Sequence, residues 1–194
     1  MKRTYTRALL ILFVIAAVLT CIQATSHAET KAYQRTIENY AIPDVTLINQ
    51  NGTKVNLRKL AESDKPVIVD FVFGTCTTIC PVLSTGYINL QQKLGADTQK
   101  IHLISISIDP ENDTPGVMKD YLKRYRAKPG WDFLTGSRKD IDAVMKAFNA
   151  YIPNKMNHYA LTLIRTPQDG KWTRILGIMS SSELMSETRK AGVK

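Results

Sequence analysis

The sequence predicts an α/β fold in which helices flank a central sheet with parallel pairing at its middle. Two runs, PVIVDFVF at 66–73 and IHLISISI at 101–108, are almost continuously apolar and rich in β-branched residues, as interior strands covered on both faces are. Segments with apolar residues at helical spacing follow both runs. Strands that alternate with helices in this way are typical of parallel pairing.

The part of the chain before the first interior strand is expected to contain an N-terminal β-hairpin. Pro43 opens this segment, and Asn51 and Gly52 lie between two alternating apolar stretches, which is a strong signal for a tight turn. Residues 29–42 are polar without clear periodicity, and we interpret them as a lead-in segment. One folded domain is therefore expected over residues 43–194, a length that suits a single hydrophobic core.

The helix after strand 66–73 is expected to begin at Pro81 and to end at Gly95. Proline is favoured in the first turn of a helix, and glycine is common just past the last turn. The residues expected to form the apolar side of this helix are Leu83, Tyr87, Leu90 and Leu94.

The second half of the chain continues the alternation of strands and helices. Thr114 with Pro115 is typical of a helix start, and Ser137 is expected to cap a further helix. A short strand, WDFL at 131–134, lies between the two helices. The remaining expected elements are strands in YALTLIRT and KWTRILGI joined by a turn at 168–170, and a final helix from about Ser182.

Residues 1–28 have the composition of an export segment. Three basic residues within the first seven positions precede an uncharged run rich in Leu, Ile, Val and Ala. The letters SHA at 26–28 favour cleavage of a signal peptide, yet the run is long enough to cross a bilayer of about 30 Å, so retention as a membrane anchor stays open. Acylation of Cys21 is a third alternative. We therefore expect an exported, periplasmic protein, either soluble or tethered to the inner membrane.

The charge of the exported part favours an acidic partner. Without residues 1–28, three of the 26 Lys and Arg are lost, so 23 basic residues face 17 acidic ones, a net charge of +6. Such a balance helps docking on an acidic protein or an anionic membrane surface. Basic and aromatic residues alternate in KDYLKRYRAKPGW at 119–131, but helical spacing places the basic residues on a solvated face. We expect no nucleic acid as partner.

Export leaves Cys76 and Cys80 as the only cysteines, which excludes a disulfide-rich scaffold. The strand before them would deliver both to its carboxyl edge, next to the amino-terminal end of the following helix. Because that end stabilises a thiolate, we expect lowered thiol pKa values. A spacing of four residues puts both sulfurs on one side of a helical turn, where they could chelate one ion or close a disulfide.

Several roles for this cysteine pair stay open from the residues alone. A purely structural disulfide would close a very small loop, so its entropic benefit would be small. A thiol:disulfide oxidoreductase fits the exported compartment, although the usual spacing for that chemistry is CxxC. Structural zinc normally has four protein ligands, and the sequence offers no convincing fourth.

Four segments carry a resemblance to a known family. They follow, in order and spacing, the pattern of the Sco/SenC proteins, a copper-binding branch of the thioredoxin superfamily. The resemblance covers roughly residues 40–190. The segments are DFVFGTCTTICPVLS, ISIDPENDTPGVMKDYLKRY, WDFLTGSRKDIDAVMKAF and NHYALTLIRTPQDGKW.

The resemblance implies a thioredoxin-like fold, a central mixed sheet flanked by helices, and a role in placing copper in the binuclear site of cytochrome c oxidase. Carried over by position, the metal ligands are Cys76, Cys80 and His158. Two thiolates favour Cu(I), and an added imidazole makes the set able to hold Cu(II) as well. Met156, beside this histidine, is expected to pack, and His102 is interpreted as a structural strand residue.

The function that follows is a metallochaperone and not a turnover enzyme. Its client would be a copper-receiving protein such as cytochrome c oxidase subunit II, with other thiol-redox proteins as further partners, and the membrane as well if the N-terminal segment stays uncleaved. In the alternative, Cys76 and Cys80 are the catalytic redox pair that reduces client cysteines, and His158 tunes their acidity.

The chain departs from the family at two places beside these residues. Thr77 and Thr78 stand where the family commonly has Pro-Asp, and Asn157 stands where it commonly has Asp. Two carboxylates that would add negative charge near a bound cation are therefore missing. Their absence is expected to weaken copper affinity or to favour redox chemistry.

Three other carboxylates need an explanation. Asp109 and Asp113 lie in the loop after strand 101–108, and we expect them to cap the next helix and to set the turn. Asp70 lies inside the first apolar strand, where a charge is costly unless it is paired or protonated. It either faces the cysteine region or turns toward solvent, and the sequence leaves both open.

Overall fold

The computed structural model describes residues 32–193. The predicted export segment, residues 1–28 with Cys21, lies outside these residues. The elements, in chain order, are β1 (Tyr33–Glu38), β2 (Thr46–Asn49), β3 (Lys54–Asn56), α2 (Leu57–Ala61), β4 (Val67–Val72), α3 (Ile79–Leu94), the 3-10 helix η1 (Gly95–Lys100), β5 (His102–Ser107), α4 (Pro115–Arg124), β6 (Trp131–Thr135), α5 (Arg138–Ala147), the 3-10 helix η2 (Lys155–Asn157), β7 (Leu161–Arg165), β8 (Trp172–Gly177) and α6 (Ser181–Lys190).

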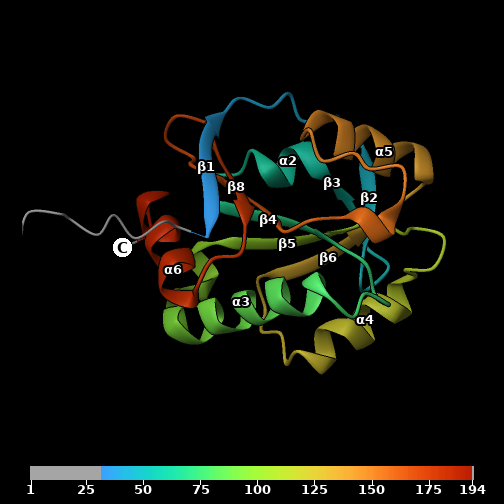
Figure 1. Cartoon of the computed structure of the whole chain (residues 1–194), viewed down its shortest axis with the longest axis horizontal. Coiled ribbons are helices and arrows are strands. Elements are labelled where there is room, and N and C mark those ends of the chain that lie inside the picture. Colours follow the sequence, from blue (N-terminus) through green and yellow to red (C-terminus); the bar gives the residue numbers. More distant parts are fainter. Residues whose placement is uncertain (1–31, 194) are drawn as a thin grey trace, which may run out of the picture. The chain divides into compact units, whose positions relative to one another are not determined.

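The strands of residues 32–193 form one mixed sheet in the order β1-β8-β7-β4-β5-β6-β2-β3. Helices α3 and α4 cover one face and α2 and α5 the other, while α6 packs beside α3 (Figure 1). The predicted α/β fold with a mixed, helix-flanked sheet is confirmed. Within the described range, no helix combines the length and apolarity that crossing a membrane would require.

The centre of the sheet is the parallel pair that the sequence predicted. Strand β4 pairs in parallel with β5 and is buried along its whole length, and β5 pairs in parallel with β6. On its other side β4 pairs antiparallel with β7, which continues through a hairpin into β8. The N-terminal hairpin is present as β2 and β3, with Gly52 at a positive φ of 77° in the turn.

Two elements differ from the sequence-based expectations. The segment 29–42 showed no periodicity, yet it contains strand β1, which pairs antiparallel with β8 at the sheet edge. Most of β1 is exposed, so no apolar alternation marks it in the sequence. Helix α3 begins at Ile79, two residues before the expected Pro81, and Cys80 therefore lies in its first turn. Gly95 ends the helix as predicted.

Aromatic side chains fill the core on both faces of the sheet. On the side of α3 and α4, Tyr87 packs edge-on against Trp131 at 5.3 Å between ring centroids. On the side of α5, Phe148 contacts both Phe71 and Trp172 at 6.0 and 5.1 Å. Successive residues of a strand face opposite sides, so Asp70, the neighbour of Phe71, belongs to the α3 side.

Candidate metal centre

Three potential ligands that lie far apart in the sequence meet at the carboxyl end of β4. The sulfur atoms of Cys76 and Cys80 and a ring nitrogen of His158 all lie within 4.8 Å of one another. Nε2 of His158 is 3.1 Å from Sγ of Cys80 and 3.9 Å from Sγ of Cys76. The structure thus brings together all three residues that the resemblance implied as ligands.

The loop between β4 and α3 sets the positions of the two sulfurs. The backbone N–H of Cys76 donates to the carbonyl of Phe73 at 3.1 Å, which closes a turn directly after the strand. The N–H of Cys80 in turn points at Sγ of Cys76 at 3.5 Å. The hydroxyl of Thr78 lies 3.6 Å from the same sulfur. Cys80 is fully buried in the first turn of the helix, whereas Cys76 keeps a small exposed area.

The two thiols differ in acidity. Burial raises the pKa of Cys76, but the hydrogen bonds from Cys80 and Thr78 together outweigh it, so the pKa is lowered. Burial raises the pKa of Cys80, and its hydrogen bond to Cys76 raises it further. The expectation of two lowered pKa values is therefore wrong for Cys80. The helix start stabilises a thiolate, but for this cysteine complete burial has the larger effect.

His158 directly follows η2, and its Nε2 atom faces the two cysteine sulfurs. Its backbone N–H donates to the carbonyl of Lys155 at 3.2 Å. Its ring packs edge-on against Phe73 with 5.2 Å between centroids. The side chain is half-buried, and burial lowers its pKa, which favours the neutral imidazole that can offer a lone pair to a metal.

The neighbouring candidates have other roles. Met156 is 69% exposed, so the expectation that it packs is wrong. His102 begins β5 and therefore lies at the opposite edge of the sheet from the cysteines, in agreement with a structural role. Thr77, Thr78 and Asn157, which stand in place of family residues, are all exposed.

In the loop between β5 and α4, the expectation that the two carboxylates cap the next helix is wrong, but the expectation that they set the turn is confirmed for Asp109. Its carbonyl accepts from the N–H groups of Asn112 and Asp113, and its carboxylate accepts from the side-chain amide of Asn112 at 3.0 and 3.1 Å. The hydroxyl of Thr114 caps α4, accepting from Val117 N–H, and neither neighbouring carboxylate takes part. Asp113 instead accepts from the N–H of Gly74 at 3.0 Å and from the hydroxyl of Ser107 at 2.5 Å. Asp109 accepts from the ammonium of Lys155 at 2.5 Å. The DPxxDTP pattern was the sequence signal for this loop, but the contacts of its acids with Gly74 and Lys155 were not predictable from it.

Asp70 is buried completely, which excludes the solvent-facing alternative. Neither of its carboxylate oxygens has a hydrogen-bond partner within residues 32–193. Burial raises the pKa of Asp70 to about 7. The side chain of Ser105, which lies on β5, lowers this pKa, but by less than burial raises it. Burial is the main cause of the raised pKa values of Cys80 and Tyr87 on α3, and the negative charge of Asp70 raises both further.

Comparison with known proteins adds the family. The family model described as SCO1/SenC matches residues 34–191. A relative described as "SCO1 protein homolog" from Bacillus subtilis is 38% identical over 117 residues, which cover 59% of this chain and 60% of the relative's length. The whole relative is thus matched over less than two thirds of its length.

Two solved structures share the fold at higher coverage. BsSco, described as a member of the Sco family of cytochrome c oxidase assembly proteins in which a disulfide switch was identified, is 31% identical, with a TM-score of 0.67 over 80% of this chain and 95% of that structure. The structure of Bradyrhizobium japonicum ScoI with copper bound is 27% identical, with a TM-score of 0.62 over 78% and 99%.

Proposed function

The chain belongs to the SCO1/SenC family, and from this premise we propose that it is a metallochaperone that binds one copper ion through Cys76, Cys80 and His158. The proposed recipient is a respiratory copper enzyme, in particular the binuclear copper site of cytochrome c oxidase. The observation that carries the proposal is the convergence of two sulfurs and one imidazole nitrogen within 4.8 Å. A relative of the same fold is described with copper bound.

The donor set fits copper better than zinc. Thiolates are soft ligands that suit Cu(I), and an imidazole suits both oxidation states of copper. Structural zinc normally has four protein ligands. Among the described residues, the His, Cys, Asp and Glu side chains that converge here number three. Binding of copper would displace the proton of each thiol, which costs more at the buried Cys80 than at Cys76.

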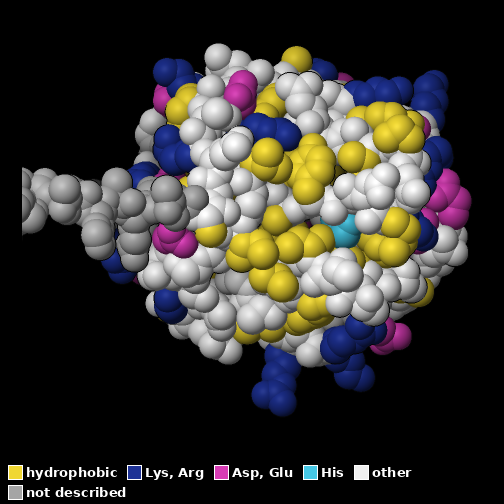
Figure 2. Space-filling view, in the orientation of Figure 1, with side chains coloured by type: hydrophobic (Ala, Val, Ile, Leu, Met, Phe, Trp, Pro, Cys, Tyr) yellow, Lys and Arg dark blue, Asp and Glu magenta, His cyan; other side chains and the backbone are white. Residues whose placement is uncertain are grey.

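The surface around the site suits contact with a client protein. Apolar side chains that are at least 37% exposed flank the ligands: Val82, Val117, Met156 and Tyr159. Figure 2 shows a face on which hydrophobic side chains gather around a histidine. Exposed apolar patches on otherwise polar surfaces often mark sites of protein contact. In this proposal, the client docks there and receives copper; export of the protein is part of the proposal and rests on the composition of residues 1–28.

A second function has its own supporting observation, the opposite shifts of the two thiol pKa values. Cys76 has the lowered pKa of an attacking thiolate, and the buried Cys80 has the raised pKa of a resolving thiol. In this alternative, Cys76 attacks a client disulfide and forms a mixed disulfide. Cys80 then releases the client, which gains two electrons and two protons, while the chain keeps an internal disulfide.

Copper stoichiometry and affinity of the reduced domain, measured without oxygen, test the first proposal. We expect one Cu(I) per chain, lost in Cys80→Ser and weakened in His158→Ala. His102→Ala is the matched control, because it removes a half-buried histidine at the other edge of the sheet and should leave binding unchanged. Negligible copper uptake by folded, reduced wild-type protein contradicts the proposal. Dithiol exchange that survives in His158→Ala would then support the alternative.

A further inference from the structure

The ligands of the proposed copper site come from two segments that are far apart in the sequence. The cysteines follow β4, and His158 lies 78 positions beyond Cys80, after η2. Helix η2 is only three residues long, so it contributes little stability of its own. Something in the tertiary structure must therefore hold the histidine against the sulfurs.

A continuous series of polar contacts, which we call the brace, connects the two segments. Its members are Gly74, Asp113, Ser107, Asp109 and Lys155. On the cysteine side, the N–H of Gly74 donates to Oδ1 of Asp113 at 3.0 Å, and Oδ2 of Asp113 accepts from the hydroxyl of Ser107 at 2.5 Å. The Ser107 oxygen accepts the N–H of Asp109 at 3.0 Å.

The histidine side of the brace is an ion pair. Oδ2 of Asp109 accepts from Nζ of Lys155 at 2.5 Å, and the carbonyl of Lys155 accepts the N–H of His158 at 3.2 Å. The Lys155 ammonium also lies 5.3 Å from the centre of the Phe73 ring, the same ring that packs edge-on against His158. Lys155 therefore touches the loop, the ring and the histidine backbone at once.

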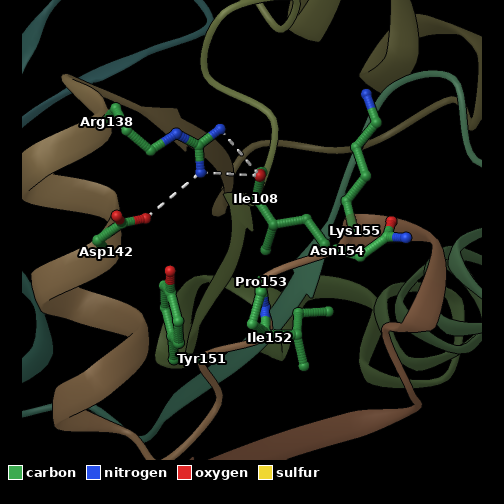
Figure 3. A pocket seen from close by; sticks show the side chains of 8 residues that line it. All are labelled: Ile108, Arg138, Asp142, Tyr151, Ile152, Pro153, Asn154 and Lys155. Carbon is green, nitrogen blue, oxygen red and sulfur yellow. Dashed lines mark hydrogen bonds and ion pairs between the residues drawn. The ribbon is translucent and has the colours of Figure 1, made fainter.

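The loop that carries the acids of the brace is held from its other side. Arg138 at the start of α5 donates to the carbonyl of Ile108 at 3.3 and 3.4 Å, and it pairs with Glu111 and Asp142. These contacts lie beside a pocket of about 340 Å³, whose wall continues through residues 151–155 (Figure 3). In that view the Lys155 side chain extends away from Tyr151 and Ile152. The loop is thus held by contacts with α5 on one side and by the Asp109–Lys155 ion pair on the other.

We propose that Lys155 is a positioning residue for the metal site, and that its ion pair with Asp109 holds His158 in reach of Cys76 and Cys80. The Asp109 side chain is 6% exposed and that of Lys155 35% exposed, so the pair is shielded from water on one side. Removing the lysine leaves a buried carboxylate without its cation, which favours rearrangement of the loop. The histidine would then lose its fixed distance to the sulfurs.

Three substitutions test the positioning role. Lys155→Met keeps the length and apolar contact of the side chain but removes its charge, and Lys155→Arg keeps the charge. Lys146→Met is the matched control, because Lys146 also stacks on an aromatic ring, that of Tyr151 at 4.9 Å, but lies outside the brace. If Lys155→Met does not fold, Asp109→Asn breaks the same pair.

The first readout needs no metal. Proton NMR of the reduced protein should show contacts from the His158 ring to Cys80 and to Phe73. We expect these contacts to be lost in Lys155→Met and kept in Lys155→Arg and Lys146→Met. The second readout is Cu(I) affinity by competition with a chelator, which should fall about tenfold or more in Lys155→Met alone, as is typical when a residue that orients a ligand is removed.

The two readouts separate this inference from the proposed function, on which its copper part rests. Ring contacts and Cu(I) affinity in Lys155→Met that match Lys146→Met would overturn the positioning role. If Lys155→Met loses the ring contacts and the wild-type protein binds no copper, the positioning role is supported and copper binding is rejected.

Discussion

Asp70 should make the stability of this protein fall as the pH rises through neutrality. Its carboxylate is fully buried without a hydrogen-bond partner in the described part of the chain, and burial raises its pKa from 3.8 to about 7. The folded state therefore holds the proton more tightly than the unfolded state. Its stabilising contribution is complete below pH 3.8 and is lost as the pH rises through about 7.

The size of the effect follows from the displacement of the pKa. A shift from 3.8 to about 7 corresponds to roughly 4 kcal/mol between the two limits, since one pH unit contributes about 1.4 kcal/mol. About 2.5 kcal/mol of this should be lost between pH 5 and pH 8. Asp70→Asn cannot ionise, so this part of the pH dependence should be absent from the variant.

Urea unfolding of the reduced, metal-free protein at pH 5 and pH 8, followed by fluorescence of the buried tryptophans, measures the difference. Comparison of variant and wild type cancels the titration of the histidines. Glu187→Gln is the control: Glu187 is equally buried but paired with Arg35 and Lys190, and its pKa is lowered, so its loss should cost about the same at both pH values. A free energy of unfolding that depends on pH equally in Asp70→Asn and wild type would refute the reasoning.

Three further outcomes follow from the structure. Gly74→Ala should lower the free energy of unfolding in urea by about 1–3 kcal/mol, because the new Cβ would meet Oδ1 of Asp113 at 2.7 Å. Gly86→Ala is the control: this glycine lies inside helix α3, and its new Cβ would meet Leu184 at an ordinary 3.6 Å, so the substitution should be neutral or stabilise by about 0.5–1 kcal/mol. Equal effects of the two substitutions would contradict this prediction. Iodoacetamide followed by mass spectrometry should modify Cys76 well before Cys80, with a midpoint pH below that of a free thiol, and preferential labelling of Cys80 would disprove the thiol assignment. Tyr87→Phe should leave stability unchanged or raise it, since the buried Tyr87 hydroxyl has no partner among residues 32–193, and a loss above about 1 kcal/mol would show an unseen hydrogen bond.

The sequence was sufficient for the parts of the fold that local patterns mark. The continuous apolar runs that became β4 and β5 identified the sheet centre, and Gly52 identified the first hairpin. Strand β1 was not predicted, because an exposed edge strand carries no apolar alternation. The start of α3 was placed two residues too late, because Pro81 is the third residue of the helix and not the first.

The site was predictable only in part, for a different physical reason. The cysteine spacing is local, but nothing near His158 in the sequence links it to residues 78 positions away, and the resemblance alone implied it as a ligand. The acidity of Cys80 was misjudged because burial is a tertiary property. The contacts of Asp113 with Gly74 and of Asp109 with Lys155 were missed for the same reason, since both join segments distant in the sequence.

The distance in sequence between His158 and the cysteines has a thermodynamic consequence. An unfolded chain still carries the CxxxC pair, but it does not hold the imidazole beside it. A metal that uses all three ligands therefore prefers the folded chain, and ligand binding and folding are linked. At a free metal concentration a thousand times the dissociation constant, metal binding would stabilise the folded state by about 4 kcal/mol. Any binding of the metal to the cysteine pair of the unfolded chain would reduce this stabilisation. A metal-loaded protein should thus resist proteolysis longer than a metal-free one, because the protease cleaves the unfolded or opened chain.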